Sequence, residues 1–215
     1  HLAGMAAQMD AIMALSEKHG FKVIEDCAQA HGAKYKGQSV GTIGHIGAWS
    51  FCQDKIMTTG GEGGMVTTND KDLWSFMWSY KDHGKNYDAI YNREHPPGFR
   101  WLHESFGTNW RMTEMQAAIG RIQLTRMAGW TLRRQDNAKL IDDAVKDLSV
   151  VRSIDVPDYI EHAEYKHYLF VCPENLAEDW TRDRIVEEIV KQGVPAFQGS
   201  CSEVYLEKAF DNTPW

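Results

Sequence analysis

The sequence lacks the features that mark membrane, nucleic-acid-binding and metal-binding proteins. No apolar run approaches the roughly 20 residues that span a bilayer, and no signal-peptide pattern opens the chain. Basic residues never run longer than two and the net charge is −7, so neither a membrane nor a nucleic acid is an expected partner. The nine histidines form no H-E-x-x-H motif, so we expect no metal site. These absences predict a cytoplasmic protein.

Cysteine is also scarce, with four residues at wide and irregular spacing. Cys27, Cys52, Cys172 and Cys201 include no C-x-x-C pair, which is the spacing typical of zinc and redox sites. Reduced thiols of an intracellular protein account for this pattern. The 215 residues, 43% of them hydrophobic, are enough for one sizeable core, or for one domain and part of another.

One stretch of the chain combines an apolar strand, a lysine and four glycines. Residues 46–52 are predicted to form the strand, Lys55 lies on the loop after it, and residues 60–64 (Gly-Gly-Glu-Gly-Gly) lead into another strand. Glycine lets the backbone pass close to a ligand. Upstream, the apolar strand 21–26 ends in Asp26 and is followed by small residues. An amine and a carboxylate suit pyridoxal phosphate, which needs the first for its aldehyde and the second for its ring nitrogen.

The hydrophobic periodicity predicts an α/β fold. Helices are expected over residues 7–19, 71–82, 113–148 and 181–192, and strands over residues 21–26, 46–52, 63–68, 150–157 and 166–172. Residues 34–44 predict a loop or hairpin, and residues 83–108 a long irregular segment rich in aromatic side chains. A helix followed by a short apolar strand is typical of parallel sheets, whose ligands gather beyond the carboxyl ends of the strands. Asp26 lies at such an end.

Local patterns within these helices predict their starts and their buried faces. Thr113-Glu-Met-Gln116 is a capping box, Thr181 is an N-cap, and Gly193 is a stop signal. The loop histidines, His31 among them, are expected to be solvated. Apolar residues at helical spacing are expected to face inward: Leu73, Phe76, Met77, Met115, Ile119, Ile122, Met127, Ile185, Ile189 and Val190.

Four segments resemble the DegT/StrS sugar aminotransferases. The family's blocks are D-A-A-Q-A-H-G-A, F-S-F-x-x-x-K, T-T-G-E-G-G and G-x-N-Y-R-M. This chain has Asp26-Cys-Ala-Gln-Ala-His-Gly-Ala33, Trp49-Ser-Phe-Cys-Gln-Asp-Lys55, Thr58-Thr-Gly-Gly-Glu-Gly-Gly64 and Gly107-Thr-Asn-Trp-Arg-Met112. The resemblance implies an α/β protein of fold type I. Its large domain, over residues 1–130, would hold a mainly parallel sheet with flanking helices, and residues 131–215 would begin a smaller α+β domain.

The resemblance also implies roles for individual residues around pyridoxal 5'-phosphate. Lys55 would carry the cofactor and then move a proton in catalysis, and Asp26 would pair with the ring nitrogen. Gln29 would hydrogen-bond the phenolic oxygen, and Ala28 would let the ring lie against it. From the residues alone, Asp26 standing by itself would be a turn or cap residue, and Gln29 could equally satisfy loop backbone.

Two further residues are implied to bind the cofactor's phosphate. Ser50 would bind it through its hydroxyl, and Asn109 would reach the phosphate of the neighbouring subunit, which makes a homodimer the expected assembly. The residues alone leave other interpretations open. A serine within a strand can be a plain outward-facing polar residue, and an asparagine before a helix is often a turn residue.

By resemblance, the reaction moves an amino group from glutamate to the keto group of a nucleotide-linked deoxysugar, for lipopolysaccharide, other polysaccharides or antibiotic sugars. A keto-sugar 3-dehydratase of the same fold is an alternative, but that branch has histidine where this chain has Lys55. A binding or regulatory protein, or an inert fragment, is another. Family members are substantially longer, so the chain is expected to be a fragment without their N-terminal section. Cys27, Trp49 and His45 depart from the family pattern, so the resemblance does not identify the residues of the substrate pocket.

Overall fold

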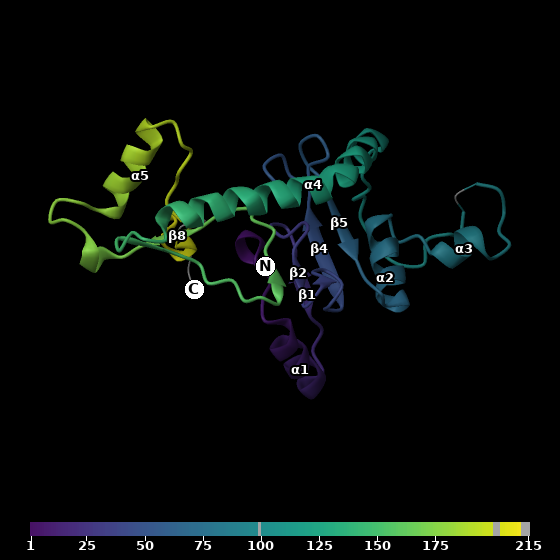
Figure 1. Cartoon of the computed structure of the whole chain (residues 1–215). Coiled ribbons are helices and arrows are strands. Elements are labelled where there is room, and N and C mark those ends of the chain that lie inside the picture. The colour runs from purple at the N-terminus through teal and green to yellow at the C-terminus, as the bar shows by residue number, and fades with distance from the viewer. Residues whose placement is uncertain (99, 200–202, 212–215) are drawn as a thin grey trace. The chain divides into compact units, whose positions relative to one another are not determined.

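The computed structural model describes residues 1–98, 100–199 and 203–211, which form two compact units (Figure 1). The first unit comprises His1–Asp136 and Val156–Tyr165, and the second comprises Asn137–Asp155 and Lys166–Trp215. The chain therefore leaves the first unit after Asp136, re-enters it for the ten residues Val156–Tyr165, and then continues in the second unit. The predicted domain boundary at residue 130 stays a prediction, although it lies in the same long helix as the first change.

The first unit is built on a three-stranded sheet with the strand order β1–β4–β5 (Figure 1). β1 (Ile24–Asp26) runs parallel to β4 (Ile46–Ser50), whereas β5 (Gly64–Thr67) runs antiparallel to β4. The predicted α/β class is confirmed, with a mixed sheet in this chain. Asp26 pairs with Ala48, so the carboxyl ends of β1 and β4 meet at one edge of the sheet. Such an edge is where ligands of α/β proteins bind.

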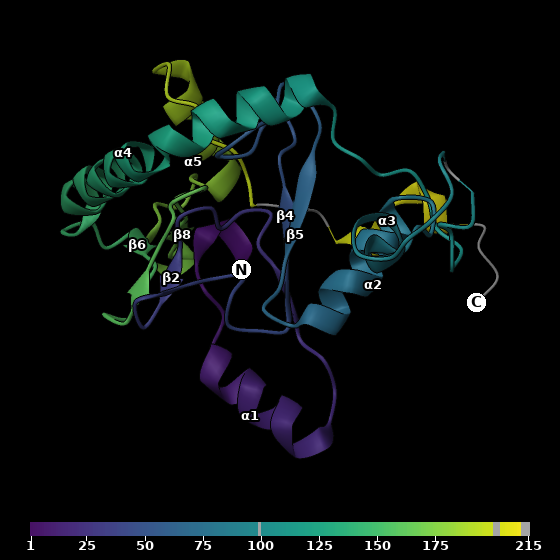
Figure 2. The same ribbon diagram turned by 90° about the vertical axis from the view of Figure 1, so that its right-hand side faces the viewer.

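Two helices of the first unit begin and end close to their predicted limits. α1 (Met9–His19) ends at Gly20, whose left-handed φ of 74° lets its N–H donate to the Ser16 carbonyl at 2.8 Å. α2 (Lys71–Lys81) begins after Asp70, whose carboxylate accepts the first free backbone N–H groups of the helix. The short α3 (Tyr87–Tyr91) lies within the segment predicted to be irregular, and Figure 2 shows α2 and α3 beyond β5.

The longest helix, α4 (Glu114–Val145), starts at the predicted capping box. Thr113 Oγ1 accepts from Gln116 N at 3.3 Å, and Thr113 N donates to Gln116 Oε1 at 2.9 Å. The first part of α4 crosses beyond the ends of β4 and β5 (Figures 1 and 2). There Thr58 N donates to Gln123 Oε1 at 3.0 Å, which fixes the loop after β4 to the helix.

A hairpin and a returning segment complete the first unit. β2 (Lys34–Tyr35) and β3 (Gln38–Ser39) form the hairpin, as predicted for residues 34–44. β7 (Ile160–Glu161), which the sequence did not indicate, lies in the returning segment and pairs antiparallel with β2. The core of this unit is made of small and medium side chains: Ala6, Met9, Val23, Cys27, Ala30, Ala33, Tyr35, Val40, Ile160 and Ala163.

The second unit contains the end of α4, a two-stranded antiparallel sheet and one amphipathic helix. β6 (Val151–Ser153) pairs with β8 (Leu169–Val171), within the two predicted strands. α5 (Arg182–Lys191) begins at the predicted N-cap, where Thr181 Oγ1 accepts from Arg184 N at 3.2 Å. Single turns of 3₁₀ helix occur in the two units at Leu2–Gly4, Pro173–Asn175, Val204–Leu206 and Lys208–Phe210.

Several side chains predicted to face inward are exposed instead. Phe76 on α2 is 68% exposed, and Met115 and Ile122 on α4 are 77% and 57% exposed. Ile24 in β1, which lies within the apolar strand predicted over residues 21–26, is 64% exposed. The remaining predicted inward residues are exposed or half-buried: Leu73, Met77, Ile119, Met127, Ile185, Ile189 and Val190. Periodicity identifies an apolar face but not what covers it, and patches of this kind are typical of interaction surfaces.

Two further sequence expectations concern the membrane and the cysteines. In the described part of the chain, no helix combines the length and apolarity needed to cross a bilayer. Cys27, Cys52 and Cys172 are free thiols, and Cys201 lies outside the described residues.

Candidate functional site

The edge where β1 and β4 end brings two of the predicted residues together. Asp26 is the last residue of β1, and its Oδ1 accepts from Ala28 N at 3.0 Å. Ser50 is the last residue of β4, and its Oγ accepts from Cys52 N at 3.3 Å. Both side chains are held by the turn that follows their own strand. The Asp26 carboxylate is anchored on one oxygen yet exposed, as a group that pairs with a ligand must be.

Gln29 is fixed by a distant part of the backbone. Its Oε1 accepts from Ala3 N at 2.7 Å, so the amide satisfies one backbone donor. The same bond orients the amide group, because an oxygen engaged with Ala3 leaves Nε2 as the end that can donate to a ligand. The bond is therefore compatible with the predicted donation to a phenolic oxygen.

Lys55 lies half-buried on the loop between β4 and β5. Its backbone N–H donates to the Cys52 carbonyl at 3.1 Å, which places the lysine in a tight turn. Its Nζ lies 5.3 Å from the centroid of the Tyr165 ring. The Tyr165 hydroxyl in turn donates to Asp54 Oδ2 at 3.2 Å. A hydrogen bond from the Cys52 thiol, the Lys55 charge and the Tyr165 hydroxyl hold the pKa of Asp54 below its usual value.

The glycine-rich turn that follows the Lys55 loop packs tightly against Phe51 and Thr59. Phe51 N donates to the Gly63 carbonyl at 2.8 Å, which begins the pairing of β4 with the following strand. A Cβ atom on Gly63 would lie 2.1 Å from Thr59 Oγ1, closer than any real contact. Only glycine therefore allows the backbone to pass here.

His31 is buried, contrary to the expectation of a solvated loop histidine, with 4% of its surface exposed. Its ring packs against those of Trp49 and Phe51, at centroid distances of 5.2 and 5.8 Å. Within the described residues, neither ring nitrogen has a hydrogen-bond partner of good geometry. Burial lowers the pKa of His31 to about 4, so the imidazole is neutral at physiological pH.

Asn109 lies apart from the residues at the sheet edge. It is exposed, its Oδ1 accepts from Arg111 N at 3.4 Å, and its backbone forms an isolated bridge with Asp82. In the described ranges, no hydrogen bond joins Asn109 to the other predicted site residues. Its contacts are those of a turn residue, and its role toward a second subunit stays a prediction.

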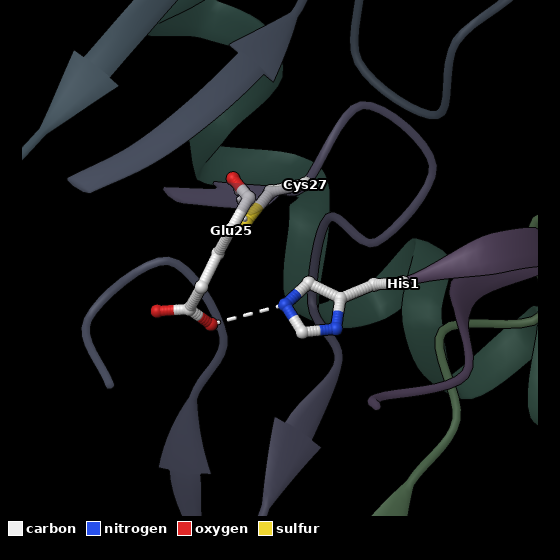
Figure 3. Close-up of side chains that lie close together, drawn as sticks. All are labelled: His1, Glu25 and Cys27. Carbon is white, nitrogen blue, oxygen red and sulfur yellow. Dashed lines mark hydrogen bonds and ion pairs between the residues drawn. The ribbon is translucent and has the colours of Figure 1, made fainter. Parts of the chain in front are cut away.

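A separate group of side chains has the spacing of metal ligands. Ligand atoms of His1, Glu25 and Cys27 lie within 4.8 Å of one another (Figure 3). His1 Nε2 is 3.0 Å from a Glu25 carboxylate that also accepts three backbone N–H groups, those of Gly41, Ile43 and Gly44. Burial, and next the Glu25 charge, raise the pKa of the Cys27 thiol to about 12, which disfavours the thiolate that metals bind. These contacts describe a buried hydrogen-bonded centre.

The side chains beyond β1 and β4 fit pyridoxal phosphate by their chemistry. The site offers an amine in Lys55, a carboxylate in Asp26, an amide donor in Gln29 and a hydroxyl in Ser50, while Ala28 adds little bulk. The sequence missed Tyr165 and Asp54, which contact Lys55 and each other. No sequence signal identifies Tyr165, because it lies 111 residues from Asp54 in the chain.

Comparisons with known proteins agree with this chemistry. The sequence profile of the DegT/DnrJ/EryC1/StrS aminotransferase family matches residues 1–213. An aminotransferase structure from Psychrobacter cryohalolentis is 63% identical with a TM-score of 0.92, over 99% of this chain and 56% of that chain. GDP-perosamine synthase of Escherichia coli O157:H7 is 39% identical over 69% of this chain and 38% of that protein. A pleiotropic regulatory protein of Geobacillus stearothermophilus is 36% identical over 98% of this chain and 52% of that protein.

These similarities determine both the fold and the family. The chain spans about half the length of the curated relatives it matches. The similar solved structures are aminotransferases of fold type I, so the predicted fold type is confirmed. The family's enzymes depend on pyridoxal phosphate, the cofactor predicted from the sequence. With a profile match from residue 1 to residue 213, this chain belongs to the DegT/DnrJ/EryC1/StrS aminotransferase family.

Proposed function

We propose that the protein is a pyridoxal-phosphate-dependent aminotransferase that moves an amino group from glutamate to a nucleotide-linked keto sugar. The observation that carries the proposal is Lys55 on the loop after β4, whose carboxyl end lies beside that of β1 with Asp26. The similarity to GDP-perosamine synthase supports a nucleotide-linked sugar as the substrate class. The proposal includes a cytoplasmic location and a product used for polysaccharide or lipopolysaccharide synthesis.

Each residue at the sheet edge has a definite task in this proposal. Lys55 binds the cofactor through its amine and afterwards moves a proton as general base. Asp26 keeps the ring nitrogen protonated, which lets the cofactor act as an electron sink. Gln29 donates from Nε2 to the phenolic oxygen, because its Oε1 is held by Ala3 N. Ser50 already accepts from Cys52 N, so its hydroxyl hydrogen is the part that can donate to the phosphate.

Two other functions compete with this proposal. The name of the Geobacillus relative favours a regulatory protein, which would bind cofactor without transferring an amino group. A keto-sugar 3-dehydratase uses histidine in place of the cofactor-binding lysine, and Lys55 argues against it. A complete constellation of amine, carboxylate and amide at one sheet edge favours the aminotransferase.

Glutamate-dependent bleaching of bound cofactor tests the function. We expect the protein with pyridoxal phosphate to show the visible absorption band of lysine-bound cofactor. Glutamate should bleach the band and release a stoichiometric amount of 2-oxoglutarate, and a nucleotide-linked keto sugar should restore it. A band that glutamate leaves unchanged would favour a regulatory binding protein. The absence of any band would remove the enzyme proposal.

The proposed assembly is a homodimer in which Asn109 binds the cofactor phosphate in the neighbouring subunit's site. Asn109 is exposed, while its backbone is anchored at Asp82, whose carboxylate lies 3.2 Å from both Lys85 Nζ and Arg111 Nη1. The helix that follows presents the exposed apolar side chains Met115 and Ile122. Exposed apolar side chains on a helix are typical of surfaces that pack against another subunit.

Mixing two defective variants tests whether Asn109 acts across a dimer, at a pyridoxal phosphate concentration that loads the wild type but leaves Asn109→Ala largely unloaded. Asn109→Ala should weaken cofactor binding about tenfold through one lost hydrogen bond to a charged phosphate. Mixed with Lys55→Ala and allowed to exchange subunits, it should regain about a quarter of the wild-type activity, because about half of the dimers are hybrids with one intact site. If Asn109 serves its own subunit, the hybrids hold no intact site and the mixture recovers nothing.

A further inference from the structure

Residues 156–165, the returning segment, are hydrogen-bonded to other parts of the first unit at several points along their length. β7 pairs with β2, Ala163 N donates to the Gly4 carbonyl at 3.0 Å, and Tyr165 N donates to the Ala3 carbonyl at 3.0 Å. The segment carries two tyrosines, Tyr159 and Tyr165, and each has a lysine ammonium group over its ring. One of these lysines is Lys55 and the other, Lys36, lies in the hairpin away from the sheet edge.

Tyr165 connects the two parts of the candidate cofactor site. Its ring contacts Lys55 Nζ at 5.3 Å, and its hydroxyl donates to Asp54, the residue before that lysine. Its backbone N–H binds the carbonyl of Ala3, whose own N–H binds Gln29 Oε1 at 2.7 Å. A continuous chain of contacts therefore joins the amine that would bind the cofactor to the amide that would bind its ring oxygen.

We propose that Tyr165 is a positioning residue that holds the Lys55 amine ready for bond formation with the cofactor; this inference rests on the proposed function. A lysine side chain has four flexible bonds, and fixing it costs conformational entropy during binding. An aromatic face attracts the ammonium group and restricts it before the cofactor arrives. The ammonium group would then lose a proton to solvent, and the neutral amine would add to the cofactor's aldehyde with release of one water. The hydrogen bond to Asp54 fixes the ring itself, so the ring is a rigid surface for the lysine.

Tyr159 provides a matched control on the same segment. Its hydroxyl donates to Gln8 Oε1 at 3.0 Å, and Lys36 Nζ lies 5.8 Å from its ring centroid. The ring also makes an edge contact with Tyr35 at 5.5 Å. Removing Tyr159 therefore deletes the same kinds of contact, on the same segment, around a lysine that has no place in the cofactor site.

The rate at which cofactor-free protein binds pyridoxal phosphate tests the inference. The wild type, Tyr165→Leu, Tyr165→Phe and Tyr159→Leu are stripped of cofactor and mixed with it in a stopped-flow spectrometer, which records the visible band. We expect Tyr165→Leu to form the band about tenfold more slowly, and Tyr165→Phe, which keeps the ring, to slow it about twofold to threefold. Tyr159→Leu should match the wild type. Should Tyr165→Leu fail to fold, Tyr165→Met, which keeps more of the packing volume, takes its place.

The outcomes separate this inference from the function on which it rests. A band in the wild type that forms equally fast in Tyr165→Leu would overturn the role of Tyr165 and leave the function intact. Equal slowing in Tyr165→Leu and Tyr159→Leu would also overturn it, because the effect would then come from loss of packing in the segment. A wild type that forms no band would instead overturn the proposed function. Thermal melting curves of both leucine variants measure the packing loss separately.

Discussion

Lys55→Ala is expected to abolish amino transfer, lowering kcat by about a thousandfold or more. The variant loses both the amine that would bind the cofactor and the general base that would move the proton. The Lys55 charge acts on the Tyr165 ring and on the exposed Asp54 carboxylate, and exposed charge contacts of this kind contribute little to folding. Stability should therefore change little. The measurement is steady-state transfer from glutamate, with absorbance spectra of the cofactor-loaded wild type and variant.

The control for Lys55→Ala is Lys36→Ala. Lys36 also lies over a tyrosine ring and bonds Asp10, but it belongs to the hairpin of β2 and β3. We expect this variant to keep the visible band and its activity. Small primary amines added to Lys55→Ala should restore part of the proton transfer, because they replace the missing base. The same visible band and activity in Lys55→Ala and the wild type would show that the reacting lysine is elsewhere.

Glu25→Ala is expected to lower the free energy of unfolding by about 3–5 kcal/mol. The Glu25 carboxylate is almost fully buried and lies 3.0 Å from His1 Nε2 (Figure 3). It also accepts three backbone N–H groups. Without it, one buried and two partly buried N–H donors of the loop between the hairpin and β4 lose their partner, and a buried donor costs about 1–3 kcal/mol when unsatisfied. Urea unfolding followed by circular dichroism measures the change.

A second glutamate provides the comparison for Glu25. Glu161 in β7 pairs with Lys34 at 3.0 Å, but both side chains are close to half exposed. Glu161→Ala should cost less than about 1 kcal/mol, because an exposed ion pair contributes little. Glu25→Gln should be destabilising too, because its amide nitrogen would face backbone donors. A Glu25→Ala variant that unfolds no earlier than Glu161→Ala would contradict the structural role assigned to this carboxylate.

The helix caps were predicted correctly because each depends only on residues that are close in sequence. The capping box at Thr113, the N-cap at Thr181 and the stop at Gly193, whose φ is 82°, each depend on residues within one turn. The first strand ends at Asp26 as predicted, because a change from apolar to polar residues marks that end, whereas β4 ends at Ser50, two residues before the predicted end. These features positioned most of the candidate site before any tertiary contact was known.

Burial was predicted less well than secondary structure. Phe76 and Met115 have the spacing of buried residues yet are exposed, whereas His31 in a polar loop is buried between Trp49 and Phe51. Helical spacing reports which residues share a face, and the partner of that face comes from elsewhere in the chain or from another molecule. The polarity of a loop likewise gives no information on the rings that fold over it.

The sequence by itself identified the family and predicted the residues that would form the cofactor site. Lys55, Asp26, Gln29, Ala28, Ser50 and Asn109 stand in motifs short enough to be recognised without a structure. Only the tertiary structure decided which distant groups support them. Tyr165 reaches Lys55 across 110 residues of chain because β7 pairs with β2, and Glu25 satisfies a loop that begins 16 residues later. Such contacts depend on which strands pair and on where the chain comes back to an earlier element, and no local pattern of residues encodes either.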